Sequence, residues 1–241
     1  MNCLVIKLKE SIENDKLPIF NGIVIRGINT AKIYSRENGG NTDIIWEIVG
    51  DGHFENSSGD NLGKVINQSQ FPTSSQSITI QSNSDVILRV KNVKELKELS
   101  ITNYTTRSEV KIDGLEYLNV KIFSLKSGNY GKSTYFDISE LQYSTDIETV
   151  DLSYLTKIKG DITEIFGDKT KLTFFESHVS GLSGTLESFV HAQRSNGRTS
   201  GTISNSEGNN WGACTINGQL ATGALSWTAD SITCGNVTVQ G

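Results

Sequence analysis

The chain has 241 residues, which is long enough to bury a sizeable core in one large domain or in two to three small ones. Charged residues make up only 20% of it and the net charge is -5, so it lacks the basic footprint of a non-specific binder of nucleic acid or anionic lipid. Gly, Ser, Thr and Asn are abundant while Pro, Met and His are scarce, which favours strands and turns over helices.

The first segment, residues 1–92, is predicted to be β structure. In the stretch CLVIKLK, apolar Leu4, Ile6 and Leu8 alternate with residues that include two lysines, so the pattern predicts a strand with one apolar face. Further strands are predicted, between turn-rich stretches, at residues 22–28, 31–35, 43–49, 77–82 and 85–91. Short strands with polar turns predict a small antiparallel sandwich or barrel.

One turn-rich stretch of this segment, GDGHFENSSGDNLG at residues 50–63, carries three carboxylates. Carboxylate oxygens are calcium ligands, but the spacing does not match that of an EF-hand loop. We therefore interpret the stretch as a solvated hairpin loop.

The middle segment, residues 93–197, contains a repeated pattern. An apolar residue is followed by a second one three positions later and by a third two positions beyond that. Four places fit, with Ser177 as the exception in the last: Leu96, Leu99, Ile101; Leu115, Leu118, Val120; Ile147, Val150, Leu152; and Leu172, Phe175, Ser177. The pattern predicts a short leucine-rich-repeat-like solenoid. The alternative is an ordinary α/β or β core with accidental spacing, because the intervals between the four places are unequal.

A second similarity supports the repeat. KIKGDITEIF at residues 157–166 matches GLSGTLESFV at residues 181–190 in five positions, and the offset along the chain is the same for all of them. Gly160 and Gly184 are expected where the chain bends away from a strand. The stretch TLESFVHAQRSNG has apolar residues at helical spacing, a cap at Thr185 or Ser183 and Gly197 after it, which predicts a helix that closes the end of the solenoid.

The tail, residues 198–241, returns to β structure in short, Gly-rich strands anchored by Trp211 and Trp227. It is expected to extend the repeat sheet, to pack on the helix or to pair with another subunit. The chain has three cysteines and no CxxC spacing, so Cys214 and Cys234 are interpreted as small buried thiols, with a disulfide across a hairpin as the alternative.

Motifs of catalysis are not found in the sequence. His53, His178 and His191 lie in different segments without a second His or Cys at ligand spacing, and GxSxG, P-loop and GxGxxG motifs are absent. We predict a chain that is not an enzyme and has no catalytic, cofactor-binding or metal-binding residues, with a hydrolase as a minor alternative. No apolar run is long enough to span a bilayer and the first residues do not resemble a signal peptide, so membrane insertion and export are not expected.

Polar residues beside the predicted repeat strands form a candidate interaction face. Alternation along a strand points them away from the core, towards protein or glycan partners, although such a face can also simply solvate the sheet. The candidate residues are Ser100, Thr102, Asn119, Lys121, Asp151, Ser153, Glu176 and His178.

Two stretches resemble a known family. The opening MNCLVIKLKESIENDKLPIFNGIVI and the later LSGTLESFVHAQRSNGRTSG are similar to parts of leucine-rich-repeat proteins encoded by Bacteroides phages and prophages, including the crAss-like phages. The middle is similar only in its pattern, and the tail after Gly201 is not matched. The resemblance implies a virion structural protein of a head fibre or tail appendage, assembled in the host cytoplasm, with the amino-terminal β domain as its attachment module.

The expected partners are other virion proteins and further copies of the chain, with no nucleic acid. The alternative is a module that adheres to a host surface protein or a glycan through the repeat face. Attachment to the virion is predicted to use the first strand and the turn after it, which would add an edge to a partner's sheet. The candidate attachment residues are Leu4, Ile6, Leu8, Leu17 and Pro18.

Overall fold

The computed structural model describes most of the second half of the chain and selected parts of the first. The described residues are 2–8, 19–20, 23–26, 30–39, 41–49, 53–55, 58–67, 77–82, 86–89, 96–103, 110–127, 134–155, 157–177, 181–206 and 210–240. Strands predominate and the two α-helices are short, which confirms the expectation of a β-rich fold. Neither helix of the described part is long and apolar enough to cross a membrane.

The chain divides into two compact units, of which the first comprises residues 1–118 and 127–134. Its elements are β1 (Asn2–Leu8), β2 (Ile19–Phe20), β3 (Ile23–Arg26), β4 (Thr30–Asn38), β5 (Asn41–Val49), β6 (His53–Glu55), β7 (Asn61–Gly63), β8 (Val65–Asn67), β9 (Ser77–Ser82), β10 (Val86–Arg89), β11 (Glu98–Asn103), β12 (Val110–Asp113) and a 3-10 turn at Leu115–Tyr117. The three-segment division predicted with boundaries after residues 92 and 197 stays a prediction.

A six-stranded sheet in the order β12-β10-β1-β4-β5-β8 forms one side of the first unit. Its neighbours are antiparallel except for the parallel pair β10 and β12. A second set of strands continues from β11 and β9, which are parallel, through antiparallel β2, β3, β6 and β7. The five strands predicted after the first one all form, as β3, β4, β5, β9 and β10.

The structure describes residues 53–55 and 58–63 of the predicted hairpin loop. Its sequence forms β6 and β7, which pair with each other, and Phe54 between its carboxylates is fully buried. The predicted hairpin is confirmed, and its described tip, residues 58–63, is exposed. What polar composition alone does not reveal is the buried aromatic residue that anchors it.

The second unit comprises residues 119–126 and 135–241. Its elements are β13 (Ile122–Ser127), β14 (Tyr135–Asp137), a 3-10 turn (Ile138–Leu141), β15 (Thr149–Leu152), β16 (Lys157–Asp161), α1 (Ile162–Phe166), β17 (Phe174–Ser177), β18 (Gly181–Ser183), α2 (Leu186–Ser195), β19 (Gly201–Ile203), β20 (Asn210–Ile216), β21 (Gln219–Thr222), β22 (Leu225–Trp227), β23 (Ser231–Cys234) and β24 (Val237–Gln240).

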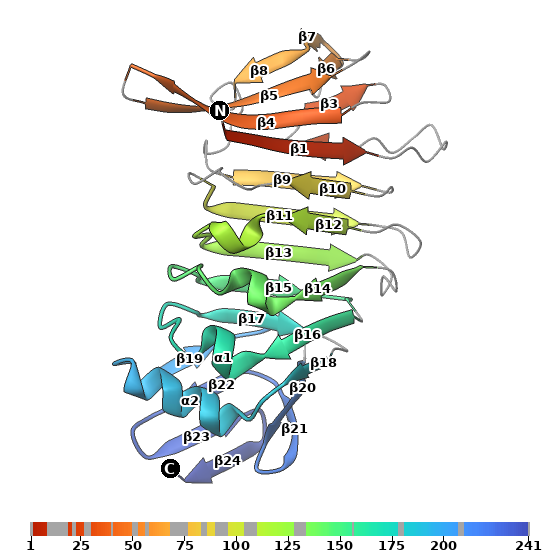
Figure 1. The fold of residues 1–241 in the computed structure, drawn as a ribbon. Coiled ribbons are helices and arrows are strands. Elements are labelled where there is room, and N and C mark those ends of the chain that lie inside the picture. The colour runs from red at the N-terminus through yellow and green to blue at the C-terminus, as the bar shows by residue number, and fades with distance from the viewer. Residues whose placement is uncertain are drawn as a thin grey trace. The chain divides into compact units, whose positions relative to one another are not determined.

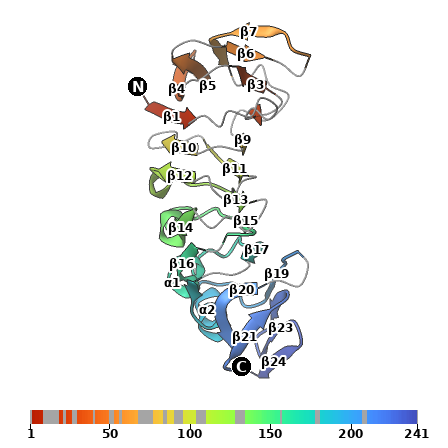
Figure 2. The ribbon, with the colours of Figure 1, turned by 90° about the vertical axis from the view of Figure 1, so that its right-hand side faces the viewer.

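Two rows of parallel strands form the main part of the second unit (Figures 1 and 2). One row contains β13, β15, β17 and β20, and the other contains β14, β16 and β18. The core lies between the rows, where Phe123 of β13 stacks on Phe136 of β14 with ring centroids 5.0 Å apart. Further along, Phe175 stacks on Trp211 at 5.1 Å. Chain segments therefore alternate between the rows, and each pass adds one strand to each of them.

The strand register corrects the position of the second predicted repeat. Phe123 pairs with Val150, and Val150 pairs with Phe175, so the residue equivalent to Ile147 and Leu172 is Val120, the last apolar residue of the predicted triplet and not the first. The triplet that fits is Val120, Phe123 and Leu125, all buried. Leu115 instead begins a 3-10 turn. The prediction was wrong because the stretch before VKIFSL offers the same spacing by chance.

The similarity between the stretches at 157–166 and 181–190 is confirmed in detail. Both begin in a strand and lead into a helix, and the residue before each helix caps it: Asp161 accepts from the Thr163 and Glu164 amides, and Thr185 accepts from the Ser188 amide. Of the two predicted caps for the second helix, Thr185 is therefore the one used. Gly160 and Gly184 have φ of +130° and +117°, values that residues with a Cβ rarely adopt.

The tail forms strands β19 to β24. Its antiparallel sheet has the order β19-β22-β23-β24, and β21 joins the row of β20 through an Asn217-Gly218 turn in which both residues have positive φ. Cys214 and Cys234 are buried free thiols, as predicted. Strand β21 was not predicted, although the Asn-Gly pair is a strong hairpin signal.

Candidate functional site

The parallel strands of the second unit present a polar face on the side away from the core. Because side chains alternate along a strand, the neighbours of buried Phe123, Val150 and Phe175 point to the opposite face. Register partners there are Ser124, Asp151 and Glu176, which form a polar row across β13, β15 and β17. This row contains two of the predicted interaction residues.

Solvent hardly reaches this row, which differs from the expectation of an outward face. Asp151, Ser153 and Glu176 are 7%, 5% and 2% exposed. Asp151 accepts hydrogen bonds from the backbone amide and the hydroxyl of Ser153 and forms an ion pair with Lys126. The residues are closed off because their own neighbours fold over the carboxylate.

Glu176 is covered in the same way by a segment of the tail. Its Oε2 accepts a hydrogen bond of 3.0 Å from the backbone amide of Ser206 and another from the Ser206 hydroxyl. A buried carboxylate is stable only when such donors replace water. Glu176 therefore ties the tail to β17, and an interaction role would require that contact to open.

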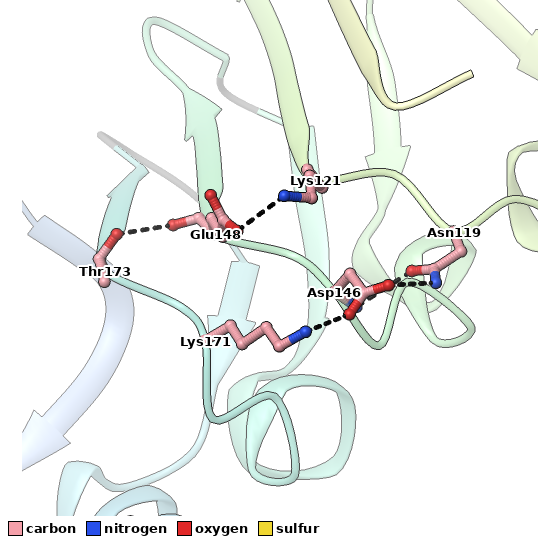
Figure 3. Close-up of polar contacts among 6 residues, drawn as sticks. All are labelled: Asn119, Lys121, Asp146, Glu148, Lys171 and Thr173. Atoms are coloured by element: carbon pink, nitrogen blue, oxygen red, sulfur yellow. Dashed lines mark hydrogen bonds and ion pairs between the residues drawn. The ribbon is translucent and has the colours of Figure 1, made fainter. Parts of the chain in front are cut away.

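Asn119 and Lys121 do not lie in the row of Asp151. The sequence-based prediction grouped them with Asp151 because it began the second repeat at Leu115 instead of Val120. They precede β13, and their equivalents are Asp146 and Glu148 before β15, and Lys171 and Thr173 before β17 (Figure 3). We call these six residues the polar ladder. Each position of the ladder bonds to its equivalent in the next repeat.

The first rail of the ladder joins Asn119, Asp146 and Lys171. Asn119 Nδ2 donates to Asp146 Oδ2 over 2.8 Å, and the Asp146 amide donates to Asn119 Oδ1 over 3.0 Å. On the far side, Lys171 Nζ donates to Asp146 Oδ1. This hydrogen bond and the charge of Asp146 raise the pKa of Lys171 above its usual value. Asp146 thus binds the repeats on both sides of it.

The second rail joins Lys121, Glu148 and Thr173. Lys121 Nζ forms an ion pair with Glu148 Oε1 at 3.3 Å, and the Thr173 hydroxyl donates to the Glu148 carbonyl. The backbone repeats the same connection, since the Glu148 amide donates to the Lys121 carbonyl and the Thr173 amide donates to the Glu148 carbonyl, at 2.8 and 2.9 Å. The exposed ion pair contributes little, and the backbone bonds hold the register.

The remaining predicted residues do not join this face. Ser100 and Thr102 are half-buried on β11 of the first unit. His178, Leu17 and Pro18 lie outside the described residues. The strand with Leu4, Ile6 and Leu8, β1, pairs with β4 on one side and β10 on the other. Strand β4 pairs with residues 2–7 of β1 and β10 pairs with residues 5–8, so residues 5–7 have a strand on both sides and could not add to a partner's sheet without losing one of these pairings. The attachment role of the five candidate residues stays a prediction.

Residues that sequence reasoning missed hold the end of the second unit together. Gln193 is buried on α2, and its Nε2 donates to three carbonyls after α1, those of Phe166, Gly167 and Lys169, at 2.8, 3.1 and 3.3 Å. Arg198 stacks on Trp227 at 4.7 Å and donates to the Leu172 carbonyl over 2.6 Å. Periodicity predicted α2. A polar residue, Gln193, on the buried side of this helix was the signal that its side chain bonds to the carbonyls at the end of α1.

Metal-binding geometry is not found among the described residues, where no group of three or more His, Cys, Asp or Glu side chains could hold an ion. Burial raises the pKa of Cys214 to about 12 and that of Cys234 to about 11, so both thiols stay protonated and poorly nucleophilic at neutral pH. What the face can do chemically is to bond one repeat to the next.

Comparison of the chain with protein-family models, with curated proteins and with solved structures found no match.

Proposed function

We propose that this chain is a structural component of a phage virion, in a head fibre or tail appendage, and acts by assembly and display. The observation that carries the proposal is the polar ladder. Its side chains make their hydrogen bonds and ion pairs to the equivalent side chains and carbonyls of the neighbouring repeat. Polar groups that bond in this way stabilise the stacking of one unit on the next, as in repeat proteins, where each unit contacts mainly its neighbours.

The middle of the chain, on this proposal, is a short leucine-rich-repeat-like solenoid closed by α2, preceded by an amino-terminal β-sandwich or barrel. The corrected repeat positions Leu96, Val120, Ile147 and Leu172 support it, because they are nearly evenly spaced along the chain. With Leu115 in place of Val120 the spacing was uneven, so the irregularity that favoured an accidental pattern is much reduced. All four residues are fully buried.

The resemblance of the opening stretch and of the stretch around α2 to leucine-rich-repeat proteins of Bacteroides phages supports the virion as the location. The partners are then other virion proteins and further copies of the chain, assembled in the host cytoplasm. The amino-terminal β domain remains the proposed attachment module, but through a surface other than residues 5–7 of β1, since these pair with a strand on both sides.

The test is to purify phage particles from a producing culture on a density gradient and to probe the fractions with antibodies raised against the purified chain. The expected result is a signal that peaks with the particles and persists after a high-salt wash. A host cytosolic protein of similar abundance serves as the control for trapping. A signal confined to the unassembled fractions overturns the proposal.

A second candidate function, adhesion to a host glycan, is supported by exposed aromatic residues. Tyr135, Tyr143 and Tyr154 of the second unit are 48%, 61% and 39% exposed, and exposed aromatic rings provide flat apolar surface for the faces of sugars. Lys159 Nζ lies 5.3 Å from the centre of the Tyr135 ring and covers one of its faces. The exposure of these rings moves the candidate glycan contact from the buried row of Asp151 and Glu176 to the tyrosines.

The adhesion candidate predicts that purified protein binds host cells and that the double substitution Tyr135→Ala and Tyr143→Ala reduces this binding at least tenfold. The same protein with Tyr135→Phe and Tyr143→Phe keeps the rings and retains binding. Equal binding by both double variants excludes a role for these rings, while particle incorporation is tested separately.

A further inference from the structure

The part of the tail that follows Arg198 carries almost no charge. Between positions 199 and 241 the sequence has two charged residues, Glu207 and Asp230, although charged residues make up 20% of the whole chain. The strands β19 to β24 lie in this stretch, so the antiparallel sheet and the β20–β21 hairpin are built from neutral residues. Depletion of charge is typical of the central part of protein interfaces.

The last strand, β24, forms one edge of the antiparallel sheet (Figures 1 and 2). Among the described residues it pairs only with β23, through the register Cys234 with Val237 to Ser231 with Gln240. Its sequence VTVQ is rich in β-branched residues and contains no Pro and no charged residue, the residues that usually protect an edge from pairing.

The geometry of the hairpin shows which backbone groups face outwards. A two-residue turn, Gly235-Asn236, joins β23 to β24, and the residues that flank such a turn bond to each other through their backbones. Hydrogen bonding alternates along an antiparallel strand, so the amides and carbonyls of Thr238 and Gln240 point away from β23. The Thr233 and Thr238 hydroxyls, 3.0 Å apart, fit the close side-chain spacing of a pair without backbone bonds.

The opposite edge of the same sheet is protected. Strand β19 pairs with β22, and Arg198 donates from Nη2 to the carbonyl of Thr202 over 3.2 Å. The guanidinium both occupies a backbone acceptor of that edge and places a positive charge beside it. The two edges of one sheet therefore differ, and within the described part of the tail it is the β24 edge that is neutral and has backbone groups available for a further strand.

We propose that β24 pairs antiparallel with β24 of a second copy of this chain, so that the two four-stranded sheets become one continuous sheet of eight strands. A twofold axis through such a contact brings the same residues together from both copies. The chain has a net charge of -5, so two copies repel each other through charged faces, and the neutral tail is where repulsion is least. Two identical neutral edges can pair with each other around a twofold axis without bringing like charges together, which is why a second copy is the occupant that fits.

This inference extends the proposed structural function by naming a surface through which copies assemble. The test compares the full chain with Thr238→Lys, which places a charge on the free edge, and with the matched control Ala229→Lys. Ala229 is exposed in the turn before β23, so the two variants change the net charge equally at different positions. Thr238→Lys also removes the hydrogen bond between the Thr233 and Thr238 hydroxyls, so Thr238→Val, which removes that bond without adding a charge, is included as a second control. Circular dichroism and urea unfolding verify that all the variants keep the fold.

The measurement is the native mass by light scattering or sedimentation, from dilute to concentrated solution. The unchanged chain and Ala229→Lys are expected to reach at least twice the chain mass of 26.4 kDa, while Thr238→Lys stays at the monomer mass. Hydrogen exchange gives a second readout: the Thr238 and Gln240 amides become protected as concentration rises, and the Thr238→Lys variant loses this protection.

A monomeric unchanged chain at all concentrations overturns the proposal, and so does a Thr238→Lys variant that associates as well as Ala229→Lys. A mass above the monomer without new protection at Thr238 and Gln240 shows that copies associate through another surface, which also contradicts it. None of these outcomes bears on whether the chain sediments with particles, so failure here is distinguishable from failure of the proposed function.

Discussion

At the scale of single residues, two glycines mark where the chain turns from a strand into a helix. A Cβ at Gly160 would overlap the Cγ1 of Ile138, which belongs to the preceding repeat. A Cβ at Gly184 would come within 3.1 Å of Ile162 Cγ2, from the repeat before it. The glycines are thus required both by backbone conformation and by the close approach of the neighbouring repeat.

The substitution Gly160→Ala tests this packing. It combines a positive φ of +130° with an overlap in the core, and we expect it to lower the free energy of unfolding by about 2 to 4 kcal/mol in urea titrations. Gly197→Ala is the control, because φ there is +92° with no atom near the new Cβ, and the expected loss is about 1 kcal/mol. Equal losses for the two variants contradict a packing role for Gly160.

Gln193 is a second residue whose side chain supports another element. Replacement by Leu keeps an apolar helix face but leaves the carbonyls of Phe166, Gly167 and Lys169 without this donor. The expected loss of unfolding free energy is about 1 to 3 kcal/mol.

Gln193→Glu is a sharper version of the same test, because it places a buried carboxylate against carbonyl oxygens. Burial and these acceptors raise the folded-state pKa of the new group, while the Arg198 guanidinium, whose Nη1 lies 3.4 Å from Gln193 Oε1, opposes that rise. The substitution is therefore made in an Arg198→Met background, where the variant should be least stable, relative to that background, at neutral pH and recover as the carboxyl protonates in acid. A deficit that does not depend on pH between neutral and acid is the result that argues against the cap.

The buried thiols predict a loss of stability in alkali. Burial raises the pKa of Cys214 to about 12 and of Cys234 to about 11, from 9.0 in the unfolded chain. Because the folded state favours the neutral thiol, the contribution of each thiol to the free energy of unfolding is fully present below pH 9.0. This contribution is lost as the pH rises towards the folded-state pKa values. Urea titrations should therefore show falling stability between these limits.

The matched variant for this prediction is Cys214→Ala, which removes the group with the larger pKa shift and should flatten the alkaline decline. The pKa of Lys171 is also raised, so this residue too lowers the stability of the fold as the pH rises above 10.5. Lys171→Met is therefore introduced into both the unchanged chain and Cys214→Ala, so that the remaining difference between them comes from the thiol. An alkaline decline of unchanged slope in Cys214→Ala rules out the thiol as its source.

At the scale of elements, the polar ladder fixes the register between successive parallel strands. Asn119 and Asp146, which precede different strands of the row, are joined by two hydrogen bonds. In the second rail the backbone makes the equivalent connection, because the Glu148 and Thr173 amides donate to the carbonyls of Lys121 and Glu148. Side-chain pairs of this kind add to the backbone bonds because parallel strands have no hairpin turn to set their alignment.

A double-mutant cycle measures the first rail. Asn119→Ala and Asp146→Ala should each destabilise the second unit, and their coupling energy should be about 1 kcal/mol, as expected for the hydrogen bond from Asn119 Nδ2 to Asp146 Oδ2. The bond from the Asp146 backbone amide to Asn119 Oδ1 is lost only in Asn119→Ala and does not enter the coupling energy. Lys171→Ala should have a smaller effect that vanishes in high salt, since its ammonium group is exposed. A coupling energy near zero between Asn119 and Asp146 indicates that the ladder does not hold the repeats.

Sequence patterns predicted the elements better than the face they present. The strands of the first segment, the helix with its Thr185 cap and the likeness of the stretches that lead into α1 and α2 follow from period and capping, which are local properties. The row of Asp151 and Glu176 was predicted to be exposed to solvent. Alternation along a strand predicts which face of the sheet a side chain lies on, but not whether other residues cover that face. The cover comes from Lys126 and from Ser206, and Ser206 lies in the tail, which no local pattern connects to β17.

The misplaced second repeat had a different cause. Leu115, Leu118 and Val120 satisfy the same spacing as the true triplet that begins at Val120, and a single sequence offers no register to choose between them. The choice is made by pairing with β15, a contact between strands far apart in sequence. Asn119 and Lys121 were predicted as part of an outward strand face, yet they belong to the ladder that the structure reveals.

At the scale of the whole molecule, the chain combines parallel strands, whose flanking polar groups bond to equivalent positions beside the next strand, with a neutral tail in which β24 pairs along one edge only among the described residues. On the proposed function, the polar groups beside the parallel strands stabilise the chain itself, and other surfaces, such as the edge of β24, make the contacts with partner proteins. The proposed partners are therefore engaged through surfaces outside the core.

The central claim is that this chain is a structural part of a virion, and copy number measures it most directly. Mass spectrometry with isotope-labelled peptides of the chain can count copies per particle across the infectious peak of a density gradient, with the major capsid protein as the internal reference. The account predicts a fixed number of copies per particle, the same in independent preparations and in every fraction of the peak. Copies that are absent from the peak, or whose number per particle varies with the preparation, contradict it.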